Sequence, residues 1–175
     1  LTPRHLLAEL GAETAIVEFL WLQEDTGLTG SSTRYVAFVA FGGSQPTVRL
    51  CDLGSSKELD RLIAAWLLEI HSRGANEENA GLALAEKLWS PIAQILPSVK
   101  RLVIVPDGSL VEVPFAALPT RADRRLVDDY DLETRTSGRD CLEGPVRVVH
   151  WKDARVVRDA CAPPRARKKT LWQSL

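Results

Sequence analysis

The chain has 175 residues, of which 45% are hydrophobic and 26% are charged, and its formal net charge is −1. These values suit one globular domain with a real core and argue against a disordered chain or a membrane protein. The longest uncharged run, 35–48, is too short to span a bilayer, and the N-terminus lacks the pattern of a signal peptide. The three cysteines are widely spaced and form neither a disulfide framework nor a zinc-binding spacing, so we expect a protein of the reducing cytoplasm with no membrane partner.

The first part of the chain predicts a small antiparallel meander. Extended apolar runs at 15–22, 34–41 and 48–51 are separated by connectors rich in glycine, serine and proline. Turn residues at such short separations are typical of hairpins, so each run should pair with the next.

Two helices should follow the meander. Ser55 and Glu58 have the spacing of a capping box, and apolar residues recur at helical spacing from there to Ile70, before Gly74. A second helix is expected over 77–89. Ser90 and Pro91 should then open one further helical turn that ends near Pro97.

The segment 102–118 combines a buried strand with turn residues. Leu102–Val105 is apolar throughout, which predicts a strand covered on both faces. Pro106, Asp107 and Gly108 predict a hairpin-like reversal. Leu110–Val113 should resume an extended course, and Phe115–Leu118 should form a short packing turn. From these residues alone, an ordinary β-turn in any α/β protein remains an equal interpretation.

Residues 126–133 alternate between apolar and acidic side chains, as in a strand with one face in water. We expect the acidic side chains to be solvated. Alternation on a strand sends them to opposite faces, so they should not converge on a cation. The acidic positions are Asp128, Asp129, Asp131 and Glu133.

The character of the chain changes after residue 143. Residues 144–175 contain eight basic and two acidic residues, so they carry 8 − 2 = +6 and the preceding residues carry 14 − 21 = −7. The segment reads as a flexible basic tail that is either solvated, neutralises its own acidic domain, or makes weak contact with nucleic acid or another acidic surface. The chain also contains no methionine, which we interpret as the mark of a piece or a processed form.

The run Pro-Asp-Gly-x-Leu-x-x-x-Pro-Phe-x-x-Leu, here Pro106 to Leu118, resembles the signature in the N-terminal half of CHAT domains. These are caspase- and separase-like modules that usually follow tetratricopeptide repeats, although no such repeat is visible here. Residues 88–92, Leu-Trp-Ser-Pro-Ile, are similar to the family's helix end. Residues 125–130 followed by Ser137 are similar to its acidic strand and serine, so the resemblance covers roughly 12–142.

The resemblance implies an α/β fold in which the N-terminal antiparallel meander and helices lead into an incomplete caspase-like α/β core. Residues 1–143 would be the N-terminal part of a CHAT-like domain. Residues 144–175 would hold the first core strand, at Val146–His150, followed by the basic tail. Leu102–Val105 looks buried on both faces, yet a caspase-like sheet ordinarily continues with strands that this chain lacks, so we expect exposed apolar surface and an unpaired strand edge.

Catalytic members of the family resemble caspases in using a His–Cys pair, in His-Phe-Ala-x-His-Gly-like and Ser-Ala-Cys-like motifs, and neither motif occurs here. His150 and Cys161 are the best remaining pair. Only ten residues separate them, whereas a parallel crossover needs a dozen or more. The other cysteines and histidines predict structural roles: Cys51 is a buried thiol in the third strand, Cys141 precedes the core, and His5 and His71 are solvent-facing or helix-terminal.

We therefore assign no catalytic, cofactor-binding or metal-binding residue and expect no cofactor. Two functions remain open. The chain is either the non-catalytic N-terminal portion of a CHAT-family cysteine-peptidase-like domain, or a stand-alone interaction or regulatory module with a truncated or altered C-terminus and a basic tail. The expected partners are other proteins or the missing C-terminal half of the domain. An intact parent would be a peptidase or a regulated signalling scaffold.

Overall fold

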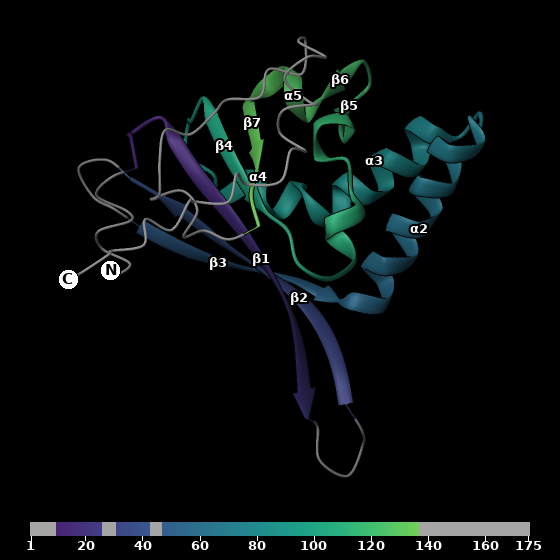
Figure 1. Ribbon diagram of the computed structural model, residues 1–175, viewed down its shortest axis with the longest axis horizontal. Coiled ribbons are helices and arrows are strands. Elements are labelled where there is room, and N and C mark those ends of the chain that lie inside the picture. The colour runs from purple at the N-terminus through teal and green to yellow at the C-terminus, as the bar shows by residue number, and fades with distance from the viewer. Residues whose placement is uncertain (1–9, 26–30, 43–46, 137–175) are drawn as a thin grey trace, which may run out of the picture.

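The computed structural model describes residues 10–25, 31–42 and 47–136. In that part of the chain the strands β1 (Thr14–Asp25), β2 (Ser31–Phe41) and β3 (Thr47–Ser55) form an antiparallel meander, as the sequence predicts. β1 and β2 continue well past the body of the domain as a projecting pair of strands (Figure 1). The meander therefore forms one half of the sheet, and the ends of its first two strands form the projection.

The other half of the sheet is parallel. β4 (Arg101–Val105) lies between β1 and β7 (Asp131–Thr134) and is parallel to both, which gives the order β3-β2-β1-β4-β7. Four of the five β4 residues are buried, as expected for a central strand covered on both faces. The α/β fold class is confirmed.

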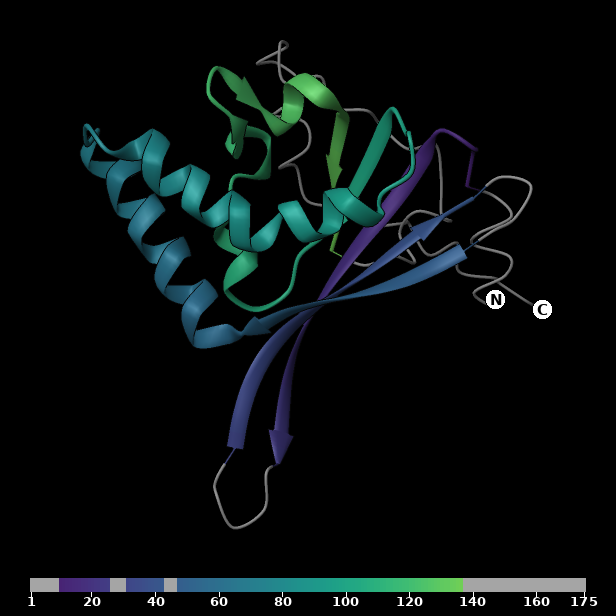
Figure 2. The same cartoon turned by 180° about the vertical axis from the view of Figure 1, so that it is seen from behind.

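Three helices cover one face of this sheet. They are α2 (Ser56–Ser72), α3 (Glu77–Leu88) and α4 (Ser90–Ile95), and both views place them on the same side (Figures 1 and 2). Their apolar side chains, including Trp66, Leu84 and Ile92, pack with the inward residues of the strands into one core. None of the helices in the described ranges is long and apolar enough to cross a membrane.

The ends of α2 differ in detail from the expectation. Ser55 occupies the N-cap position, but its side chain makes no capping hydrogen bond. Glu58 instead pairs with Lys87 of α3, at 3.0 Å, so the predicted capping box is wrong. At the other end Arg73 takes the left-handed conformation, with φ 52°, and the Gly74 amide donates to the Glu69 carbonyl. The helix thus ends before Gly74, but the left-handed residue is Arg73.

The hairpin-like reversal after β4 is also wrong. Instead of an extended run, the chain forms two short 3₁₀ helices, η2 (Gly108–Glu112) and η3 (Phe115–Ala117). β1 and β7 already pair with the two edges of β4, so no edge is left for a hairpin partner. A 3₁₀ turn places residues three apart on one side, and Leu110 and Val113 are both buried. The predicted packing turn at Phe115 is confirmed.

The predicted strand over 126–133 forms only in its second half. A small ribbon of β5 (Pro119–Arg121) and β6 (Arg124–Arg125) leads into the helical turn α5 (Leu126–Asp129), and β7 follows. The Arg125 amide donates to Asp128 Oδ2, at 2.8 Å, which stabilises the start of that turn. Local capping therefore overrides the strand-like alternation.

β4 is paired on both sides, so it is not an edge of the sheet. In the described part of the chain the edge strands are β3 and β7. The exposed apolar side chains of the sheet fall on β3 and on the projecting strand β1, at Val48, Leu50, Trp21 and Leu22. The open apolar surface is thus on the meander side of the sheet.

Candidate functional site

The Pro-Asp-Gly run lies at the carboxyl end of β4, where the chain leaves the sheet. Asp107 has an extended backbone, and its Oδ1 accepts a hydrogen bond from the next amide, Gly108 N, at 2.8 Å. Its Oδ2 accepts from the amide of Trp21 on β1, at 2.9 Å. Both carboxylate oxygens therefore accept from backbone amides, and the turn is tied directly to the neighbouring strand.

Tyr35 of β2 holds the same turn from the other side. Its hydroxyl accepts from the Ser109 amide, at 2.9 Å, and donates to Asp60 Oδ1 of α2, at 3.3 Å. The side chain is fully buried, and this burial, more than any other influence, raises the pKa of the phenol. The hydroxyl therefore joins the turn, the meander and helix α2.

Gly108 is required by this arrangement. Its φ is +57°, a backbone conformation that residues other than glycine rarely adopt. A Cβ at this position would also lie 2.5 Å from the Tyr35 hydroxyl oxygen. We call this set of contacts between Asp107, Gly108, Ser109, Tyr35, Asp60 and Trp21 the turn latch. The sequence signals the turn, but Tyr35 and Trp21 lie 74 and 86 residues from their partners and no sequence pattern points to them.

The other predicted residues lie apart from the latch. Cys51 is buried in β3, and burial, aided by Asp52, raises the pKa of its thiol, so the unreactive protonated form is favoured. His71 is exposed in the last turn of α2, where its Nδ1 lies 2.6 Å from the Leu67 carbonyl oxygen. His5, His150, Cys141 and Cys161 lie outside the described residues, as do the strand expected at 146–150 and the basic tail.

The acidic residues of 126–133 are not simply solvated, contrary to expectation. Glu133 of β7 is 5% exposed and lies between two arginines: its Oε2 accepts from Arg101 Nη2, at 3.2 Å, and its Oε1 accepts from Arg135 Nε. Asp129 accepts from Arg124, at 2.6 Å, and from Thr120. Arginine partners lower the cost of burying a carboxylate. Within the described ranges no cluster of these side chains could hold a metal ion.

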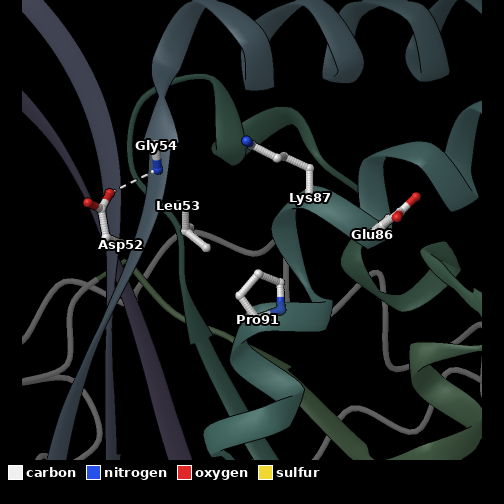
Figure 3. Close-up of a pocket in the computed structure, with 6 residues that line it drawn as sticks. All are labelled: Asp52, Leu53, Gly54, Glu86, Lys87 and Pro91. Atoms are coloured by element: carbon white, nitrogen blue, oxygen red, sulfur yellow. Dashed lines mark hydrogen bonds between the residues drawn. The ribbon is translucent and has the colours of Figure 1, made fainter.

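The described residues line grooves that are open to solvent, and two of them bear on the position of a site. One, of about 260 Å³, lies between β3 and the helices α3 and α4 (Figure 3). The other, of about 450 Å³, has Trp89, Arg121, Asp129 and Tyr130 in its wall. Burial, and to a lesser extent the nearby Asp129 carboxylate, raises the pKa of Tyr130.

The larger of these two grooves lies where β4 and β7 begin, whereas ligands of α/β sheets bind beyond the carboxyl ends of the strands. The carboxyl end of β4 is occupied by the turn latch.

A comparison with protein families finds the CHAT domain at residues 78–174, which is more than half of the chain. The chain belongs to the CHAT-domain family, and its α/β fold fits the caspase-like character of that family. The match begins with α3, so the meander and α2 precede it. It includes the whole Pro106–Leu118 signature and most of the segment 144–175. No curated protein matches the chain.

Proposed function

We propose that the chain is the non-catalytic N-terminal portion of a CHAT domain, in which residues 1–143 form the base and residues 144–175 hold a first core strand and a basic tail. The intact parent would be a cysteine peptidase or a regulated signalling scaffold of the cytoplasm. The turn latch carries this proposal. The polar groups of the family signature take part in hydrogen bonds that hold β1, β2 and α2 at the end of β4. This is the role of a structural scaffold.

The chemistry of the described residues supports the same proposal. A cysteine nucleophile needs a thiolate, a neighbouring histidine and oxyanion donors. Cys51 is buried with a raised pKa, and His71 is engaged with the carbonyl of its own helix. The best remaining pair, His150 and Cys161, has too few intervening residues for the parallel crossover that the family geometry uses.

A peptidase assay with the full chain tests this proposal. The chain is incubated with a peptide panel and with a thiol-directed active-site probe, beside the variants Cys161→Ala and Cys51→Ala. We expect no turnover from any of the three proteins. Turnover that Cys161→Ala abolishes and Cys51→Ala retains would show that the chain is itself a peptidase and would overturn the proposal.

A second candidate function is a self-sufficient interaction module. It is favoured by the closed core, in which Trp66, Leu84, Leu102 and Leu118 are all buried without any residue from another chain. Sedimentation of the chain at several concentrations separates the two candidates. A monodisperse folded monomer favours the module, whereas concentration-dependent association favours an incomplete domain. The nucleotide sequence beyond Leu175 gives an independent test, because a downstream His-Gly and Ala-Cys pair supports the peptidase parent.

A further inference from the structure

The groove of about 450 Å³ has no part in the proposed scaffold role. Its wall comes from α4 and the loop that follows it, and from β5 and the end of α5. The volume lies within the roughly 300–1,000 Å³ of small-molecule sites. The groove lies where β4 and β7 begin, at the other end of β4 from the turn latch. A ligand bound there would therefore not displace the latch.

One part of the wall is aromatic and apolar. The rings of Trp89 and Tyr130 meet edge to face, with centroids 5.9 Å apart, and Pro97 and Val99 line the same groove. Trp89 is only 4% exposed, so packing fixes its ring in place. Aromatic rings make favourable offset-stacked and edge-to-face contacts with other rings. This part of the wall therefore favours a ligand that contains a planar ring.

The carboxylate in the wall is already engaged by protein groups. Asp129 Oδ1 accepts a hydrogen bond from Arg124 Nη2, at 2.6 Å, and Asp129 Oδ2 accepts from Thr120 Oγ1, at 3.1 Å. The charged hydrogen bond from Arg124 offsets the negative charge of Asp129. Each oxygen of this carboxylate thus has a donor, and the groove offers little to a cationic ligand.

Two donors in the wall are not engaged in this way. Arg121 Nη2 lies 3.8 Å from Asp129 Oδ1, which is beyond hydrogen-bond distance, and the Arg121 side chain is 67% exposed. The Tyr130 hydroxyl makes no hydrogen bond within the described ranges, although the ring is partly buried. A guanidinium binds the paired oxygens of a carboxylate or a phosphate through parallel N–H donors. These donors therefore favour a ligand that carries an oxyanion.

The charges of the wall agree with this chemistry. Arg121, Arg124 and Asp129 together carry 2 − 1 = +1, and the close pairing of Arg124 with Asp129 leaves the charge of Arg121 for a ligand. We propose that the groove binds a small molecule in which a carboxylate or a phosphate is attached to a planar ring. The ring packs against Trp89 and Tyr130, and the oxyanion accepts hydrogen bonds from Arg121, with the Tyr130 hydroxyl as a second donor.

The test follows the indole N–H resonance of Trp89 by NMR in the full, ¹⁵N-labelled chain, and Trp89→Phe identifies that resonance by its loss. Phenyl phosphate and phenylacetate are the probes, because they carry the two oxyanions on the same ring. Inorganic phosphate lacks the ring, and benzylamine carries a cation in place of the anion. We expect saturable shifts with both probes and at least about tenfold weaker binding of the two comparison compounds. The probe that binds more tightly identifies the preferred oxyanion.

Two matched arginine variants locate the site. Arg121→Gln removes a guanidinium from the groove, whereas Arg61→Gln removes one from an exposed position of α2 that does not line the groove. We expect Arg121→Gln to weaken binding of both probes by at least about tenfold and Arg61→Gln to leave it unchanged. Tyr130→Phe keeps the ring and removes only the hydroxyl, so it should weaken binding by about threefold.

Four results would overturn the proposal. They are the absence of a saturable shift of the Trp89 resonance, equal binding of benzylamine and the probes, equal effects of the two arginine substitutions, and equal binding of inorganic phosphate and phenyl phosphate. The last result would mean that the aromatic wall does not contact the ligand. None of these readouts depends on peptidase activity or on the oligomeric state, so the proposal stands or falls separately from the scaffold role.

Discussion

On the helix-covered face of the sheet, side chains of β1, β2 and β4 interdigitate with α2, α3, α4 and the 3₁₀ helices in one continuous core. On the opposite face, the buried cluster is small, with Ile16, Val103 and Val105 at its centre, and it gives way to the exposed Val48 and Leu50 toward β3. The same strands supply both faces, because successive side chains alternate. Burial of a side chain therefore depends on whether its face of the sheet is covered by helices. A leucine on the helix-covered face should contribute much more to the free energy of unfolding than a leucine on the opposite face.

The largest expected effect tests this contrast directly. Leu102 is fully buried on the helix-covered face, and Leu102→Ala should lower the free energy of unfolding by about 2–5 kcal/mol, because it leaves a cavity. Leu50→Ala on the opposite face should change it by less than about 0.5 kcal/mol. Urea denaturation measures both. A loss in Leu50→Ala comparable to that in Leu102→Ala would mean that the opposite face is packed as firmly.

The turn latch on the helix-covered face should tolerate little change. Gly108→Val places a β-branched residue at a φ of +57° and against the Tyr35 hydroxyl, so it should destabilise the fold by about 1–3 kcal/mol. Gly11→Val is the matched control, because a Cβ there would meet nothing closer than 3.9 Å. Thermal melting compares the two variants, and an unchanged melting temperature in Gly108→Val would count against the latch.

The opposite face is held in part by charge, at Glu133. Glu133→Gln removes a carboxylate charge that both Arg101 and Arg135 contact and should cost about 1–2 kcal/mol, since both arginines are partly exposed to water. Glu86→Gln, on an exposed part of α3, should be nearly neutral. Urea denaturation at low and high salt provides the measurement. Equal, negligible effects of the two substitutions would show that Glu133 is only solvated.

The smallest expected effect is a loss of stability at alkaline pH. Burial raises the pKa of Tyr35 and of Tyr130 above the ordinary value of 10.0. The unfolded chain then loses these protons first, so stability is full below about pH 10 and falls as pH rises further. The slope is at most about 1.4 kcal/mol per pH unit for each proton. Tyr35→Phe should flatten the dependence of the melting temperature on pH between pH 9.5 and 11, and an unchanged slope would contradict the assignment.

Much of the fold can be predicted from local sequence. The glycine- and serine-rich connectors indicate the meander, the apolar spacing from Leu59 to Ile70 indicates α2, and the unbroken apolar run of β4 indicates a central strand. The run Pro106–Leu118 also points to the family that the match at residues 78–174 shows. Each of these signals lies within a short window, where turn chemistry and periodicity act directly.

The tertiary structure determined the features that depend on residues outside these short windows. Parallel pairing on both sides of β4 left no edge for a hairpin, so the residues after Gly108 became 3₁₀ turns that bury Leu110 and Val113. Two arginines, one of them distant in sequence, made a buried site for Glu133 in a segment that reads as solvated. The partners of the Pro-Asp-Gly turn came from β1 and β2, because the long-range hydrogen bonds of this turn depend on which strands lie beside it, and strand order is a long-range property of the fold.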